Sequence, residues 1–254
     1  MKLVLMSDIH GNTKICEAAV KLANKNNTDI IIAGDLMLGT YKDPEDQLKK
    51  VLSELSKCKN KVYVIPGNYE IYKSWLLITD PKLAKYNNII DFDKKLFDLG
   101  DAYLLGYGGG KDIYGYVVGQ TYFVINPEND RLLLDKVMSN LGKKLIFVSH
   151  MPPESYCDLA VFKWSKEKGY QAAKIGDPDA QTKHAGDKVL KELVEKNKPV
   201  LTLFGHIHEA AGYEELFTHA KVKNSKNLLI NPGSEEIYLV DVKNDVKIIE
   251  IIKV

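Results

Sequence analysis

Strands and helices alternate along the first two-thirds of this sequence. Short apolar runs at residues 3–6, 30–33 and 62–65 have the pattern of strands that are buried on both faces. The segments between them, residues 14–24 and a stretch that begins at Pro44, have the apolar spacing of core-facing helices. A helix between consecutive strands favours a crossover connection and parallel pairing. We therefore expect a parallel β-α-β-α-β unit at the start of the chain.

The rest of the chain is less regular. We expect two further helices, over residues 128–141 and 187–196, and strands over residues 102–105, 145–149 and 200–204. From residue 227 onward, short apolar runs follow one another without long helices. Turns separate these runs, which predicts antiparallel pairing among strands at residues 228–230, 237–240 and 246–252.

These elements predict a single domain over residues 1–254. No composition break, linker, internal repeat or low-complexity segment divides the sequence. The order of strands and helices favours a mixed α/β (α+β) fold, in which two mixed sheets pack face to face and helices cover the outside. The expected architecture is a four-layer α-β-β-α sandwich.

Composition places the chain among globular proteins and excludes several functional classes. Hydrophobic residues make up 45% and charged residues 27% of the chain, the usual values for a globular protein. The formal net charge of +1 gives no electrostatic reason to expect nucleic acid or a membrane surface as a partner. No apolar stretch reaches the roughly 18 residues of a membrane span. We expect no membrane partner, and the sequence does not predict an oligomeric state.

The cysteines and the arginine content limit which disulfides and which anion-binding sites we expect. The cysteines Cys16, Cys58 and Cys157 are odd in number and far apart, so we expect a reduced, cytoplasmic chain without a disulfide framework. Arg131 is the only arginine. A cluster of bidentate arginines therefore cannot be how this protein binds a phosphate or a carboxylate.

Metal-competent side chains follow five of the predicted strands. The carboxyl ends of strands are where open α/β sheets bind ligands, and four of the six histidines lie at such positions. Asp8 and His10 are two residues apart, as are His206 and His208, so in an extended or gently turning segment each pair can address one site. The candidate ligands are Asp8, His10, Asp35, Asn68, His150, His206 and His208.

These seven side chains form a mixed nitrogen and oxygen donor set. Such a set suits Mn²⁺, Fe²⁺, Zn²⁺ or Co²⁺ better than Ca²⁺. Seven ligands exceed what one tetrahedral zinc ion needs, and they match two adjacent divalent ions that share a bridging group. Glycines next to several of these residues permit tight turns close to the ions.

The order of these motifs resembles the calcineurin-like metallophosphoesterases. That family has Asp-x-His, Gly-Asp, Gly-Asn-His-Asp/Glu, a lone His and Gly-His-x-His in sequence. This chain has the corresponding blocks at residues 8–10, 34–35, 67–70, 150 and 205–208. Each block alone is a weak signal, whereas the ordered set is specific and spans most of the chain. The resemblance implies the two-sheet fold expected above.

The resemblance also implies roles for individual residues. Asp8, His10 and His208 would hold one ion, and Asn68, His150 and His206 the other, with Asp35 as the bridge. The implied reaction is hydrolysis of a small phosphoester, a phosphodiester or a small phosphomonoester, by a hydroxide shared between the ions. The two cations would supply the positive charge that arginines provide elsewhere.

Tyr69 departs from the family pattern, which places a histidine there. That histidine lies near the leaving-group oxygen and can donate a proton, whereas a phenol with a pKa of ~10 is a weaker acid. Asn68 and Tyr69 are thus the candidate catalytic residues. We expect metal binding to persist and esters with good leaving groups to be preferred.

Substrate-binding elements are less defined. His184 precedes a predicted helix whose N-terminus could bind an anion, so it is either a substrate contact or a surface residue. Residues 152–183, which include Lys163 and Trp164, have no clear periodicity and predict either a lid or a partly helical cover. The glycine- and tyrosine-rich residues 106–119 could line the substrate cleft.

Two other functions remain open on the sequence. Tyr69 leaves room for a catalytically weak member of the family that serves as a binding module, although a scaffold has no need for seven ligands. A nuclease on the same scaffold would need a basic groove, which the near-zero net charge disfavours.

Overall fold

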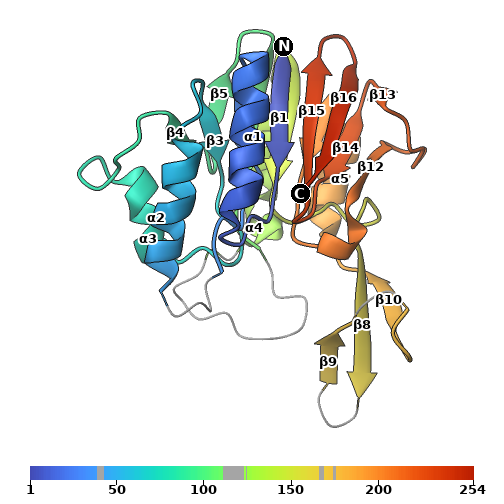
Figure 1. Cartoon of the computed structure of the whole chain (residues 1–254). Helices are drawn as coiled ribbons and strands as arrows, with labels where there is room; N and C mark the ends of the chain where they lie inside the picture. Colours follow the sequence, from blue (N-terminus) through green and yellow to red (C-terminus); the bar gives the residue numbers. More distant parts are fainter. Residues whose placement is uncertain (39–42, 111–122, 124, 166–168, 174–175) are drawn as a thin grey trace.

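Two large mixed β-sheets pack face to face in this protein, and helices cover their outer faces (Figure 1). The computed structural model describes residues 1–38, 43–110, 123, 125–165, 169–173 and 176–254. Buried apolar residues form three clusters, one between the sheets and one between each sheet and its helices. The predicted four-layer α-β-β-α sandwich is confirmed.

The first sheet contains the predicted parallel unit. Its strands β1, β2, β3 and β4 are parallel neighbours, and α1 (Thr13–Asn26) and α2 (Pro44–Leu55) cover it. β15 pairs antiparallel with β1 and with β16, as the sequence predicts for the last two runs. The order across this sheet is β13 (Asn224–Ser225), β16 (Val246–Lys253), β15 (Glu236–Val242), β1 (Lys2–Met6), β2 (Asp29–Ile32), β3 (Val62–Val64) and β4 (Ile89–Asp91).

The second sheet has a parallel centre and antiparallel edges. β6, β7, β11 and β14 are parallel, whereas β5 and β12 run antiparallel at the two edges. α4 (Pro127–Ser139) and α5 (Lys188–Asn197) cover its outer face. The order is β12 (Gly212–Glu215), β14 (Leu228–Asn231), β11 (Leu201–Leu203), β7 (Lys144–Ser149), β6 (Ala102–Tyr107) and β5 (Leu96–Asp98).

The antiparallel pairing expected for all strands after residue 227 is wrong for the first of them. β14 lies parallel to β11 in the second sheet, whereas β15 and β16 form a hairpin in the first sheet. The turn after β14 contains Gly233 with φ of 58°, and it leads the chain from one sheet to the other. A turn signal alone does not distinguish a hairpin from a change of sheet.

Local sequence explains where the long helices begin. Asn12 accepts a hydrogen bond from the backbone N–H of Lys14 at the start of α1, and Asp43 does the same for Asp46 in α2. Pro44 is the first residue of α2, where the missing N–H costs nothing. α3 (Tyr72–Thr79) has no side-chain cap and buries only Ser74 and Trp75, which explains why the sequence did not predict it.

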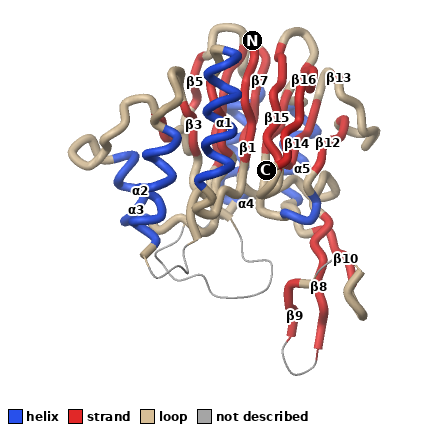
Figure 2. The backbone as a smooth tube through the Cα atoms, viewed as in Figure 1, coloured by secondary structure: helices blue, strands red, loops and turns tan. Residues whose placement is uncertain are grey.

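A third, three-stranded antiparallel sheet projects from the body (Figures 1 and 2). It consists of β8 (Leu159–Ser165) flanked by β9 (Gly169–Ala172) and β10 (Gln181–His184). The alternative of a partly helical cover over residues 152–183 is therefore wrong for the described part of this segment. Ala160, Val161 and Phe162 are buried in succession, so the alternation that identifies a strand is absent.

Two expectations remain, one for the glycine-rich loop and one for membrane-spanning segments. Of the predicted glycine-rich loop over residues 106–119, only residues 106–110 lie within the described structure. Among the described helices, none combines the length and the apolar character that a membrane crossing requires.

Candidate metal centre

All seven candidate ligands meet at one rim of the two sheets. Asp8 and His10 follow β1, Asp35 follows β2, and Asn68 follows β3, all in the first sheet. The second sheet contributes His150 after β7 and His206 and His208 after β11. The carboxyl ends of five parallel strands thus supply the whole set.

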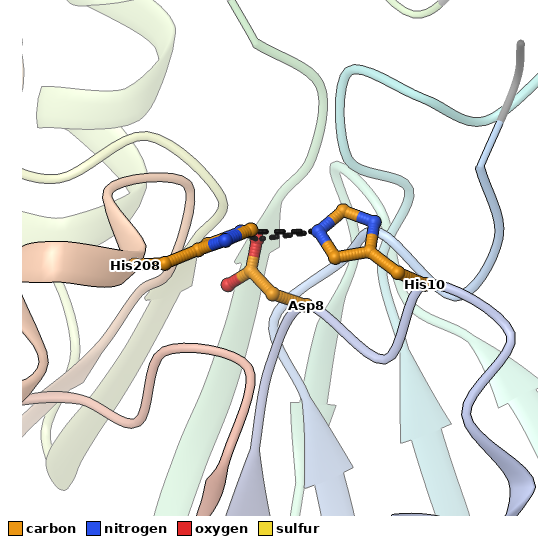
Figure 3. Close-up of side chains that lie close together, drawn as sticks. All are labelled: Asp8, His10 and His208. Carbon is orange, nitrogen blue, oxygen red and sulfur yellow. Dashed lines mark hydrogen bonds and ion pairs between the residues drawn. The ribbon is translucent and has the colours of Figure 1, made fainter. Parts of the chain in front are cut away.

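Asp8, His10 and His208 form the first group of donors (Figure 3). His208 Nε2 lies 3.1 Å from Asp8 Oδ1 and 3.0 Å from His10 Nε2. His10 Nε2 lies 3.8 Å from Asp8 Oδ1. One ligand atom from each residue is within 4.8 Å of the others, which is the spacing of donors around a single ion.

Asn68, His150 and His206 form the second group. Asn68 Oδ1 lies 2.9 Å from His150 Nε2 and 2.8 Å from His206 Nδ1. Asp35 lies between the two groups, because its Oδ2 is 3.4 Å from His150 Nε2 and 4.0 Å from His10 Nε2. This position suits a bridging carboxylate.

Charges in this buried rim shift several pKa values. Burial disfavours the charged form of His150, but Asp35 and Asp8 outweigh it and raise the pKa of His150 to about 10. Burial and the nearby positive His150 lower the pKa of His206 to about 4. Asp8 is fully buried, yet its hydrogen bond to His208 and the surrounding histidines hold its pKa below the usual value.

The residues present fit a divalent cation. His10 Nε2 and His208 Nε2 face each other at 3.0 Å, an arrangement in which two lone pairs repel unless a proton or a cation lies between them. His206 Nε2 and His10 Nδ1 are buried without a hydrogen-bond partner in the described structure. Imidazole nitrogens and carboxylate oxygens are also the donors that Mn²⁺, Fe²⁺, Zn²⁺ and Co²⁺ accept.

The ligand loops have a strained backbone. Asp8, His10, Asp35 and His206 have φ values of 50°, 47°, 53° and 71°, in the left-handed region that non-glycine residues avoid. Each such residue costs about 1–3 kcal/mol and persists only where surrounding contacts impose it. The two i, i+2 pairs are therefore not extended, and turns of the backbone aim these side chains.

Two motif glycines allow the close approach of the carboxylates. A Cβ atom at Gly67 would overlap the carboxylate of Asp35, and one at Gly205 would overlap that of Asp8. The backbone N–H of His206, the next residue, donates to both oxygens of Asp8 at 3.1 Å. Glycine at these positions lets the backbone of one loop pass close to a metal-binding carboxylate from another loop.

Glu70 has a role that the sequence did not reveal. Its buried carboxylate accepts hydrogen bonds from the backbone N–H groups of Asp35, Leu36, Met37 and Gly67. Burial and the negative Asp35 raise the pKa of Glu70 to about 8, although the amide donors oppose this shift. Glu70 thus joins the loop after β2 to the loop after β3. The Gly-Asn-Tyr-Glu block marked it as a metal-competent residue, but nothing local predicts these partners.

Tyr69 and His184 lie in different surroundings. The half-buried Tyr69 meets the ring of His10 edge-on at 5.4 Å, and its backbone N–H donates to Asp35 Oδ1 at 2.9 Å. His184 lies on β10, where its Nδ1 is 2.6 Å from Asp158 Oδ1. Asp187 caps the N-terminus of α5 with its own carboxylate. The proposed substrate contact of His184 stays a prediction.

Comparison with known proteins gives one family and a consistent fold. A family model described as calcineurin-like phosphoesterase matches residues 1–210. No curated protein matches the chain significantly. One solved crystal structure superposes with a TM-score of 0.70 at 16% identity, over 97% of each chain. A second, the crystal structure of TT1561 of Thermus thermophilus, superposes with a TM-score of 0.62 at 17% identity, also over 97% of each chain. At these identities, the similarity to solved structures supports the fold alone.

Proposed function

The chain belongs to the calcineurin-like phosphoesterase family, and from that premise we propose that it hydrolyses small phosphoesters with two divalent ions bound at the sheet rim. The observation that supports this proposal is the convergence of two donor groups beside Asp35, one of Asp8, His10 and His208 and one of Asn68, His150 and His206. A protein that binds one structural ion needs only one such group.

Each group has its own proposed ion. Asp8, His10 and His208 would hold the first, and Asn68, His150 and His206 the second, with Asp35 shared. When bound, such ions supply positive charge to phosphoryl oxygens and lower the pKa of a coordinated water. The chain provides no arginine for this purpose near the rim, because its single arginine, Arg131, lies on α4 and pairs with glutamates.

Hydrogen bonds within the chain hold the metal-binding side chains in a fixed orientation. Asp35 is held from two sides, by the N–H of Tyr69 on its Oδ1 and by Glu70 on its own backbone N–H. Ala33 O lies 2.8 Å from His150 Nδ1, which directs Nε2 of that ring toward Asn68 and Asp35. These contacts fix the donors before a substrate arrives, so little reorganisation remains for the chemical step.

Tyr69 sets the proposed preference for the leaving group. Its side chain lies beside His10, where the family histidine would donate a proton to the departing oxygen. A phenol donates that proton less readily near neutral pH. We expect aryl esters, which need little protonation, to react faster than alkyl esters. Tyr69→His should raise activity on alkyl esters, and an absence of any gain would contradict this role.

The test is a substrate panel with defined metal content. Purified protein is stripped with chelator and reloaded with Mn²⁺, Fe²⁺, Zn²⁺ or Co²⁺, and the bound ions per chain are counted. Hydrolysis of aryl phosphodiesters, aryl phosphomonoesters, cyclic nucleotides and dinucleotides is then measured with each ion. We expect two ions per chain and the highest kcat/KM on a diester or small monoester.

Other outcomes favour the alternatives. Two bound ions without turnover on any ester would favour a metal-binding module of the same fold. Salt-sensitive binding to DNA in a gel shift, together with strand cleavage, would favour a nuclease. Fewer than two ions per chain would contradict the dinuclear proposal itself.

A further inference from the structure

The projecting sheet is attached to the metal centre on both sides of His208. On the N-terminal side of this histidine, the buried side chain of Asn231 joins two segments. Its Nδ2 donates to Ile207 O at 2.9 Å and to Cys157 O at 3.1 Å, two residues before β8. Its Oδ1 accepts from Gly233 N at 3.0 Å, so every polar atom of this amide is used.

Glu209 makes the second attachment, on the C-terminal side of His208. Its Oε1 accepts a hydrogen bond of 2.7 Å from the backbone N–H of Val161, in the middle of the buried part of β8. The carbonyl of Val161 accepts from Ala173 N at 3.1 Å. The backbone of Val161 therefore bonds to Glu209 through its N–H and to Ala173 through its carbonyl. The short helix η1 (His208–Ala210) packs directly against β8.

These two attachments enclose one ligand of the first donor group. Ile207 and Glu209 are the immediate neighbours of His208. Glu209 bonds directly to Val161, whereas Ile207 is linked to Cys157 through the side chain of Asn231. The exposed His208 side chain contacts one atom of Asp8 and one atom of His10, the other two ligands of its group. Its backbone position thus depends on the base of the projecting sheet as well as on β11.

We propose that Glu209 and Asn231 are positioning residues through which the projecting sheet holds His208 in place for metal binding. This inference rests on the proposed function, because it concerns the first of the two proposed ion sites. Coupling of this kind is reciprocal, so an ion bound at His208 should in turn protect the attachment to β8. Groups that orient a metal ligand typically change metal affinity by about 10–100-fold when removed.

The first experiment measures metal affinity directly in Glu209 variants. Glu209 is exposed, so its replacement should not prevent folding. Calorimetric titration of the full chain with Mn²⁺ should show affinity at one of two sites reduced by about tenfold in Glu209→Ala, toward the low end because the bond is only partly buried. Glu209→Gln keeps an oxygen that can accept from Val161 N, and it should restore most of the affinity. Glu17→Ala, an exposed glutamate on α1, is the matched control.

The second experiment follows the attachment itself. Amide hydrogen exchange at Val161 should slow by about tenfold when Mn²⁺ is added to the wild type, and this protection should be lost in Glu209→Ala. A Glu209→Ala protein with unchanged affinity at both sites, or equal protection of Val161 in both proteins, would overturn the inference. Wild-type protein that binds none of Mn²⁺, Fe²⁺, Zn²⁺ and Co²⁺ would instead overturn the proposed function, so the two failures are distinguishable.

Discussion

The sheet rim and the projecting sheet are built in opposite ways. At the rim, Asp8, Asp35, Glu70 and His150 are buried charged or polar residues that bond to one another's loops. In the projecting sheet, all four residues of β10 are exposed, and its base is attached to the body through side chains such as Glu209. Buried polar groups tolerate few substitutions because each lost partner costs free energy. The rim should therefore respond strongly to single changes, and the projecting sheet weakly.

The largest contrast should come from Asp35→Asn. This change removes a buried negative charge between the two donor groups but keeps the shape of the side chain. We expect kcat to fall on the order of 1000-fold, the effect of several kcal/mol of charge stabilisation. Steady-state hydrolysis of an aryl phosphodiester at saturating Mn²⁺ checks it. Turnover that stays near the wild-type value would refute the bridging role.

Glycine substitutions test how closely the rim is packed. Gly205→Ala places a methyl group on the carboxylate of Asp8, so the unfolding free energy should fall by about 1–3 kcal/mol and metal binding should weaken. Gly142→Ala is the control, because a Cβ atom there meets nothing within 4 Å. Urea unfolding of both variants gives the comparison. Equal stability of the two would show that the rim relaxes more easily than its contacts suggest.

Glu70→Gln separates the positioning of Asp35 from its charge. The amide keeps one oxygen acceptor but cannot accept all four N–H groups that the carboxylate holds. We expect activity and metal affinity to fall by about 10–100-fold while the protein stays folded. Calorimetry with Mn²⁺ alongside kinetics measures both effects. A loss of activity with intact metal affinity would assign Glu70 a role in the substrate step instead.

The number of protons released on metal binding tests whether His150 is protonated in the metal-free protein. Since the pKa of His150 is raised to about 10 in the metal-free protein, an ion must displace a proton from this ring at neutral pH. Metal affinity should therefore rise by about tenfold per pH unit below pH 10. The same raised pKa stabilises the metal-free fold most below pH 6.5, and this contribution disappears as the pH rises through 10. Calorimetry in two buffers of different ionisation enthalpy counts the protons released, and a count of zero would mean that His150 is neutral.

The smallest effect is expected in the projecting sheet. Lys163 Nζ lies 3.4 Å from Asp177 Oδ2, and both side chains are more than a third exposed. Asp177→Asn should change the unfolding free energy by less than about 1 kcal/mol and leave Mn²⁺ affinity unchanged. Thermal unfolding and metal titration check this expectation. A change in metal affinity would mean that the coupling to His208 extends further along the sheet than its base.

The sequence by itself determined the layers of the fold and the identity of the rim residues. Apolar runs fix where strands are buried, and helix caps such as Asn12 and Asp43 act within a few residues of themselves. Polar residues at strand ends are also local signals, because parallel strands bring their carboxyl ends to one edge whatever the loop conformations. The two-sheet sandwich and the meeting of seven candidate ligands followed from these signals.

Only the tertiary structure decided which distant backbone groups those residues bind. Glu70 belongs to a motif block after β3, yet three of its four backbone partners lie in the loop after β2, some thirty-five residues away. Likewise, β14 pairs with β11 in the second sheet, although no signal in its own residues selects that neighbour. Glu209 bonds to β8 across 48 residues of sequence. Hydrogen bonds of this kind depend on how separate elements meet in space, and no short window of sequence encodes that geometry.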